Sequence, residues 1–134
     1  MNKIGLIYQP CGLGDILFIQ KIAYLIQNMG YEVWWPVAHE YRWLKEYIPS
    51  FNFVSWNPPV FPMEEESDPY NLKSLPLPDD FIFPYKEYYN LNNESKITEE
   101  LFFMQGFSCI GTKHPYTMLD KYRSHNIDYA DSRD

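Results

Sequence analysis

The segment from Ile4 to Pro36 constrains the fold of this chain more than any other part of the sequence. A short apolar run, Ile4–Tyr8, has the length of a buried strand, and a turn that contains Gly12 and Gly14 follows it. From Asp15 onward, apolar residues recur at the spacing of one helix face. These residues are Ile16, Ile19, Ala23 and Ile26. The pattern predicts a strand, a glycine turn and a helix in direct succession.

A second and a third strand are predicted downstream. Gly30 stands where a helix commonly ends, and Glu32–Trp35 is typical of a strand. The spacing in Val37–Tyr47 predicts a short helix that ends at Pro49, and Asn52–Trp56 again has the character of a strand. Strands that alternate with helices favour right-handed βαβ units and parallel pairing. We therefore expect an α/β fold, a Rossmann-like three-layer domain with a parallel sheet whose first strands lie in the order 3-2-1.

The sequence changes character after this βαβαβ core of residues 1–56. Seven prolines lie between residues 57 and 89, so no long helix fits there, and the many aromatic residues favour an ordered excursion over residues 57–94. Short strands are predicted at Lys73–Leu77 and Asp80–Pro84. A helix is predicted from Ser95 to Gly106 and a polar tail over residues 120–134. We expect residues 1–134 to form a single domain.

Composition excludes several classes of function. The chain has 134 residues with 11 Lys plus Arg against 18 Asp plus Glu, and no basic cluster is visible, so we expect no nucleic-acid partner. Cys11 and Cys109 form neither a CxxC pair nor a disulfide framework. His114 and His125 have no Cys or carboxylate at ligand spacing, so no metal site is predicted. No targeting segment or membrane span is evident, and a cytoplasmic location is expected.

The glycine turn allows two interpretations. Gly12 and Gly14 let backbone N–H groups approach a ligand closely, and Asp15 can project into the same crevice as a general base. Alternatively the glycines only make a tight turn and Asp15 only caps the helix. The dinucleotide fingerprint is absent, since Leu17 stands in place of its third glycine and Pro36 in place of its acidic residue. A P-loop is absent too, because no Gly-Lys-Ser/Thr follows.

The run Gly12–Leu17 and the segment Gly30–Val33 with the strand that ends at Pro36 resemble the N-terminal half of GT-B glycosyltransferases. The likeness is greatest to the heptosyltransferase-like family, whose signature is a G-x-G-D-x-L turn after the first strand. His39 and the segment Ile48–Val54 match the same half. The resemblance covers residues 3 to 56, and it implies that the domain is equivalent to one half of a GT-B fold.

The resemblance also implies a function. Enzymes of this family transfer a sugar from a nucleotide-sugar donor to an acceptor hydroxyl, with inversion, without a metal and with no cofactor beyond the donor. Asp15 occupies the position of the proposed catalytic base. Gly12, Leu13 and Gly14 would bind the sugar or glycan acceptor, and His39 could do so or could be a surface histidine. The donor-binding C-terminal domain is expected to be missing or to be a separate chain, and the alternative function is a non-catalytic Rossmann-like binding or interaction module.

Overall fold

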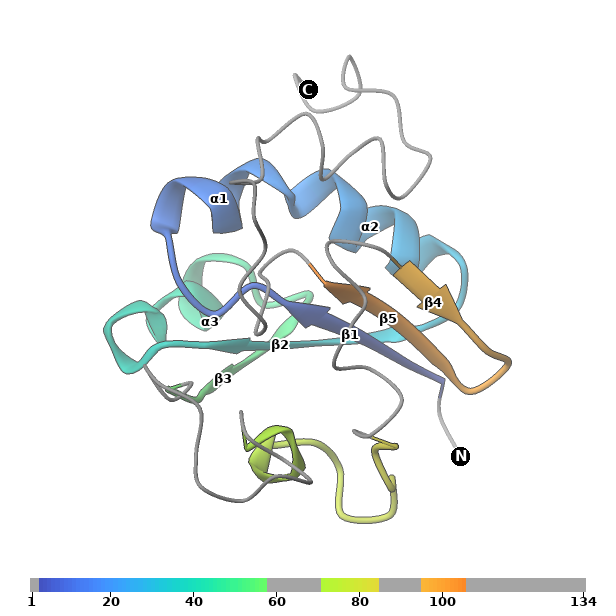
Figure 1. Ribbon diagram of the computed structural model, residues 1–134. Coiled ribbons are helices and arrows are strands. Elements are labelled where there is room, and N and C mark those ends of the chain that lie inside the picture. Colours follow the sequence, from blue (N-terminus) through green and yellow to red (C-terminus); the bar gives the residue numbers. More distant parts are fainter. Residues whose placement is uncertain (1–2, 58–70, 85–94, 106–134) are drawn as a thin grey trace, which may run out of the picture.

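The structure is a computed structural model that describes residues 3–57, 71–84 and 95–105. It shows an α/β fold built on one five-stranded sheet (Figure 1). The strands are β1 (Ile4–Tyr8), β2 (Glu32–Val37), β3 (Asn52–Ser55), β4 (Ser95–Ile97) and β5 (Leu101–Gln105). Their order is β3-β2-β1-β5-β4, and all neighbouring pairs are parallel except the antiparallel pair of β4 and β5. The predicted parallel pairing and the 3-2-1 order of the first three strands are confirmed.

The helices of the first half pack on one face of the sheet. They are α1 (Leu13–Phe18), α2 (Gln20–Asn28), the 3₁₀ turn η1 (His39–Tyr41) and α3 (Leu44–Tyr47). Figure 1 shows α1 and α2 above the sheet, and they meet at Ile19, where the backbone leaves helical geometry. The side chains predicted from helical spacing are at most 1% exposed, and they belong to a core shared with the strands. These side chains are Ile16, Ile19, Ala23 and Ile26.

Helix α2 approaches the sheet closely at Gly5 of β1. A Cβ atom added to Gly5 would overlap Ile26 Cγ2 and would stand 3.2 Å from Tyr31 Cβ. Only a hydrogen atom fits between strand and helix at this point. Gly30, where α2 gives way to β2, has a φ of +97° that suits glycine, and the predicted helix end at this residue is confirmed.

The opposite face of the sheet carries a second core. Its buried members come from β1, from β5, from the segment 71–84 and from Trp56 just after β3, and they include Leu6, Tyr8, Phe103, Leu72 and Leu75. Segment 71–84 lies below the sheet in Figure 1, and its regular part is the 3₁₀ turn η2 (Leu72–Ser74). The Trp56 indole Nε1 donates to Ser74 Oγ at 2.9 Å and ties the segment to the end of β3. An irregular layer therefore covers this face in the described part of the chain.

The strands predicted at Lys73–Leu77 and Asp80–Pro84 are wrong. Asn71 begins the segment with a left-handed φ of 56°, and the chain turns into η2 instead of extending. Pro76 and Pro78 then lack the N–H groups that a strand ladder requires.

The helix predicted from Ser95 to Gly106 is also wrong over residues 95–105, which form the hairpin of β4 and β5. Thr98 closes this hairpin, since its N–H donates to Leu101 O at 2.8 Å and its Oγ1 accepts from Leu101 N at 3.1 Å. The run Leu101–Met104 is buried on both sides between β1 and β4, which favours a strand over the local helix propensity. The predicted polar tail and most of the predicted excursion lie outside the described residues.

Candidate functional site

The turn after β1 is tied to its neighbours through its carbonyl groups. Trp35 of β2 donates from Nε1 to the backbone O of Gln9 at 3.3 Å, and Ala38 donates from its backbone N to Pro10 O at 2.9 Å. Trp35 lies inside β2, and Ala38 follows the last residue of that strand. The turn after β1 is therefore held against the end of β2.

The next two carbonyls of the turn are satisfied as well. The buried Gln9 side chain donates from Nε2 to Cys11 O at 2.7 Å, and Ile16 donates from N to Gly12 O at 2.9 Å. Four consecutive carbonyls, from Gln9 to Gly12, thus accept hydrogen bonds from the protein. Because C=O and N–H point in opposite directions across a planar trans peptide, the N–H groups that follow face the other way.

These N–H groups make the turn a candidate binding site. Within the described residues, the backbone N–H groups of Cys11, Gly12, Leu13 and Gly14 have no acceptor. Gly12 has a φ of +83°, a conformation that glycine adopts without strain. The structure therefore brings the predicted residues Gly12, Leu13 and Gly14 together as one surface of hydrogen-bond donors.

Asp15 lies in the first turn of α1 as its third residue, and its side chain is half-buried. Its Oδ2 lies 2.7 Å from the point where a Cβ on Gly12 would stand, so the carboxylate packs against the glycine. The residue at the N-cap of α1 is Gly12, which makes no side-chain cap hydrogen bond. The interpretation of Asp15 as the N-cap is therefore wrong, whereas its position at the glycine turn agrees with a role at the site.

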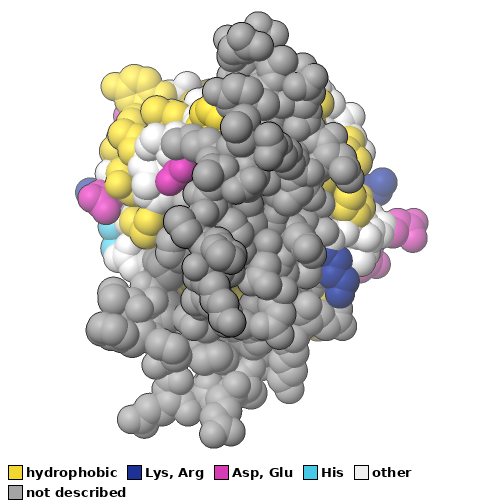
Figure 2. All heavy atoms as spheres, turned by 45° about the horizontal axis from the view of Figure 1, so that its top comes forward, with side chains coloured by type: hydrophobic (Ala, Val, Ile, Leu, Met, Phe, Trp, Pro, Cys, Tyr) yellow, Lys and Arg dark blue, Asp and Glu magenta, His cyan; other side chains and the backbone are white. Residues whose placement is uncertain are grey.

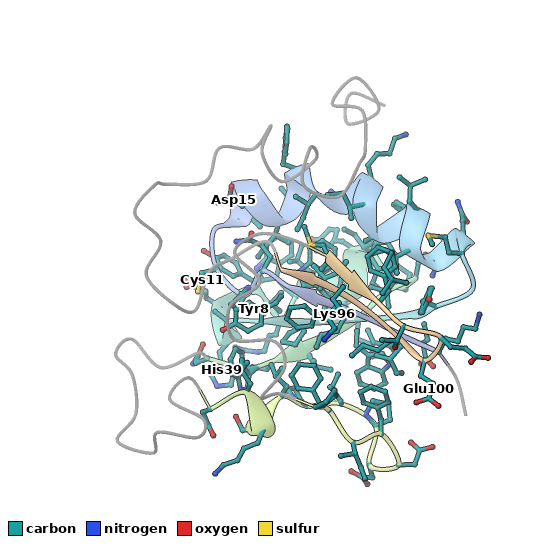
Figure 3. The ribbon with its side chains drawn as sticks, turned by 45° about the vertical axis from the view of Figure 1, so that its right-hand side comes forward. Tyr8, Cys11, Asp15, His39, Lys96 and Glu100 are labelled. Atoms are coloured by element: carbon teal, nitrogen blue, oxygen red, sulfur yellow. The ribbon has the colours of Figure 1, made fainter. Side chains whose placement is uncertain are left out.

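His39 lies at the same edge of the sheet. It begins η1 directly after β2, its side chain is exposed, and its backbone N donates to Asn57 Oδ1 at 3.3 Å. Figure 3 places Asp15, Cys11 and His39 along one edge of the sheet, with Cys11 between the other two in this view. The ends of the first three strands thus meet where the site was predicted, and the role of the His39 imidazole stays a prediction.

Cys11 is a half-buried free thiol inside the turn. Burial, and then the negative charge of nearby Glu40, raise the pKa of the Cys11 thiol above its ordinary value. A thiol with a raised pKa is a poor nucleophile at neutral pH. Cys11 therefore lines the turn as a neutral group.

The order of the strands also favours a binding site at the turn after β1. The first crossovers lead from β1 toward β2 and β3, whereas β5 pairs with the other side of β1, so the order reverses between β1 and β5. Open α/β sheets bind ligands in the crevice at such a switch point, outside the carboxyl ends of the strands. The register pairs Tyr8 with Gln105 at these ends. The turn from Gln9 to Gly14 lies directly beyond Tyr8.

A separate cavity of about 380 Å³ lies within segment 71–84, which covers the other face of the sheet. Its lining residues are Lys73, Leu75, Leu77, Pro78, Asp79, Phe81, Ile82 and Phe83. None of them belongs to the glycine turn, so this cavity is distinct from the candidate site.

In the described residues, no group of three or more His, Cys, Asp or Glu side chains could hold a metal ion. No helix in the same part of the chain is both long enough and apolar enough to cross a bilayer.

Figure 2, turned so that the top of Figure 1 comes forward, shows hydrophobic side chains at the surface among polar ones. Exposed apolar side chains of α1 and α2 and of the turn that follows α2 are Leu17, Tyr24, Leu25 and Met29.

Comparison of the chain with protein-family models, with curated proteins and with solved structures finds no significant match.

The sequence pattern did not point to Gln9 or Glu40. Gln9 ends an apolar run, and its polarity at the close of a buried strand is the one local sign of its role. Glu40 approaches Cys11 only because the turns after β1 and β2 are joined.

Proposed function

We propose that this chain is the acceptor-side domain of a glycosyltransferase that moves a sugar from a nucleotide-sugar donor to an acceptor hydroxyl, with inversion and without a metal. The observation that carries the proposal is the position of Asp15. Its carboxylate is half-buried against Gly12, in the first turn of the helix that follows β1. The G-x-G-D-x-L run and its family resemblance support the same role.

In this proposal Asp15 acts as the general base. It accepts the proton of an acceptor hydroxyl while the hydroxyl oxygen attacks the anomeric carbon, and the bond from that carbon to the phosphate oxygen of the donor breaks, so that the nucleotide leaves with the electron pair of that bond. Because the carboxylate removes the proton during the attack, the hydroxyl oxygen becomes a stronger nucleophile without the help of a metal. The anomeric configuration inverts because the attack is a single displacement.

The backbone and His39 supply the acceptor contacts. The N–H groups of Gly12, Leu13 and Gly14 donate to acceptor oxygens, and His39 contributes a side chain at the same edge of the sheet. The negative charge of Asp15 disfavours a phosphorylated acceptor at this place. A neutral sugar or glycan is therefore the acceptor class that fits.

The donor is held elsewhere in this proposal. A second domain binds the nucleotide sugar and closes the cleft, which excludes water and orients the reactants. A cytoplasmic location belongs to the same proposal, because the two cysteines suggest no disulfide framework.

The substitution Asp15→Asn tests the base. Since Asp15 makes no N-cap, the free energy of unfolding should change by no more than about 1 kcal/mol. Transfer measured with a complementing donor domain should fall about 10²-fold or more, the scale of losing a general base. Glu46→Gln, which also neutralises a carboxylate in the first turn of a short helix, is the matched control and should leave transfer unchanged. Normal transfer by Asp15→Asn would refute the proposal.

Donor binding gives a second test. Isothermal titration of the chain with a panel of nucleotide sugars should detect weak binding or none, because the donor residues of this family lie in the other domain. Micromolar affinity for any one of them would contradict the proposal that donor and acceptor are bound by different domains. Binding of a neutral sugar with no transfer under any donor condition would favour the non-catalytic binding module instead.

A further inference from the structure

Gln9 is a buried polar side chain with 1% of its surface exposed. Its Nε2 donates to the carbonyl of Cys11, two residues further along the chain, at 2.7 Å. A buried amide is costly unless it is hydrogen-bonded, and an apolar side chain of the same length would pack there without that cost. Packing alone therefore does not account for an amide at this position.

The hydrogen bond holds one peptide unit, the one that joins Cys11 to Gly12. Because the Cys11 carbonyl is turned inward to Gln9, the Gly12 N–H on the same peptide is turned outward. Glycine adopts either sign of φ at little cost, so the backbone at Gly12 does not by itself hold this orientation. Reversal of the peptide would place a carbonyl oxygen where the turn now presents a donor.

Asp15 depends on the same backbone. Its Oδ2 packs against Gly12 at a distance that leaves no room for a Cβ. A change in the φ of Gly12 would move the surface on which this carboxylate rests.

We propose that Gln9 is a positioning residue that locks the Cys11–Gly12 peptide, so that the Gly12 N–H faces the acceptor and Asp15 keeps its place against Gly12. The part played in acceptor binding rests on the proposed function. The lock itself follows from the hydrogen bonds of the turn.

Two matched variants of the full chain test the lock. Gln9→Met keeps the length of the side chain and removes the amide donor. Gln27→Met removes an exposed bond of the same chemical kind elsewhere, since Gln27 Nε2 donates to Ser50 O at 3.0 Å. Both variants are labelled with ¹⁵N and ¹³C for solution NMR.

In Gln9→Met, the carbonyl signal of Cys11 and the amide signal of Gly12 should move or split. Exchange of the Ile16 amide, which donates to Gly12 O, should become roughly three- to tenfold faster relative to amides of β1, as expected for loss of one hydrogen bond of ordinary strength. Gln27→Met should leave all three unchanged. Unchanged signals and exchange in Gln9→Met would overturn the lock.

Gln9→Glu separates hydrogen bonding from packing. An ionised carboxylate cannot donate to the Cys11 carbonyl, whereas a protonated one can. Burial raises the pKa of a carboxyl group. On acidification the introduced glutamate should therefore become protonated, and the hydrogen bond should return, at a pH above the ordinary pKa of glutamate. The Gly12 amide signal of Gln9→Glu is compared with the wild-type signal recorded at the same pH. As the pH falls, the variant signal should approach the wild-type position. Absence of this return would favour a packing role.

Titration with methyl β-D-glucopyranoside, a neutral sugar probe followed through the Gly12 and Gly14 amide signals, tests positioning. Wild type should show a saturable shift, and Gln9→Met should bind about tenfold more weakly if about a tenth of the turns keep the competent orientation. Equal affinity in the two proteins would overturn positioning while the lock stands. Failure of the wild type to bind, with the lock signals still sensitive to Gln9, would instead overturn the acceptor site and the proposed function with it.

Discussion

Replacing Gly5 with alanine tests how closely α2 is seated on the sheet. The added Cβ would overlap Ile26 Cγ2 and would stand 3.2 Å from Tyr31 Cβ, and both of these carbons are attached close to the backbone. Relief therefore requires a shift of α2, and overpacking of this kind costs about 1–3 kcal/mol. Alanine also restricts the unfolded chain, which offsets about 0.4–1 kcal/mol. The expected net loss in the free energy of unfolding is about 1–2 kcal/mol.

Urea unfolding followed by tryptophan fluorescence measures this loss. With a slope of about 1.5–2 kcal/mol/M, the midpoint of Gly5→Ala should fall by about 0.5–1.3 M. Two substitutions of Ile26 locate the cause. Ile26→Leu moves the branch away from Cβ and should relieve part of the loss in the double variant, whereas Ile26→Val keeps Cγ2 and should relieve none.

Gly14→Ala is the matched control. No heavy atom lies within 4 Å of an added Cβ there, and the residue is inside α1, so alanine should raise the free energy of unfolding by about 0.5–1 kcal/mol. An unfolding free energy of Gly5→Ala equal to or above that of wild type would refute the close approach of α2 to β1.

Three further predictions concern the turn and the second core. Gly12→Ala should lower the free energy of unfolding by at least about 1 kcal/mol, because alanine is strained at a φ of +83° and its Cβ would stand 2.7 Å from Asp15 Oδ2; a neutral effect in urea unfolding would contradict this. Burial raises the pKa of the Cys11 thiol, so its contribution to stability is complete below the unfolded pKa of about 8.5 and is lost as the pH rises through the higher folded value. The stability difference between wild type and Cys11→Ala should therefore narrow above about pH 8.5, and a difference independent of pH would count against the raised pKa. Trp56→Phe removes the bond to Ser74 Oγ and should cost about 0.5–1.5 kcal/mol. Ser74 Oγ also donates to Asn71 O at 2.7 Å, so Ser74→Ala should still lower stability in the Trp56→Phe background, but by less than in wild type; fully additive losses would show that the bond does not stabilise the fold.

The first half of the fold could be predicted because its signals are local. The three strands up to Trp56 pair in chain order, β1 with β2 and β2 with β3. Apolar periodicity indicates where helices lie between them, although Val37 belongs to β2 and the helix predicted over Val37–Tyr47 is divided into η1 and α3. The second half could not be predicted in the same way. The run Leu101–Met104 becomes a strand because it is buried between β1 and β4, and that burial is set by tertiary pairing rather than by its own helix propensity.

The candidate site likewise has one part that the sequence predicts and one part that it does not. The position of Gly12 to Asp15 at the end of β1 follows from the sequence, since a glycine turn after an apolar run has few other places to lie. The role of Gln9 depends on where the carbonyls of the turn point, and two of these carbonyls are fixed by Trp35 of β2 and by Ala38, which follows β2. Hydrogen bonds of this kind leave no periodic trace in a sequence.

The place of β5 in the sheet has a consequence for how the chain acquires its structure during synthesis. β1 is made first, yet its second neighbour, β5, is made only after residues 56 to 100 have been added. Until then one long side of β1 offers unpaired backbone groups that another chain could bind. Closing so long a loop is slow compared with forming the early βαβ contacts. Insertion of β5 is therefore the step that pairs this side of β1 and removes it as a site of aggregation in the nascent chain.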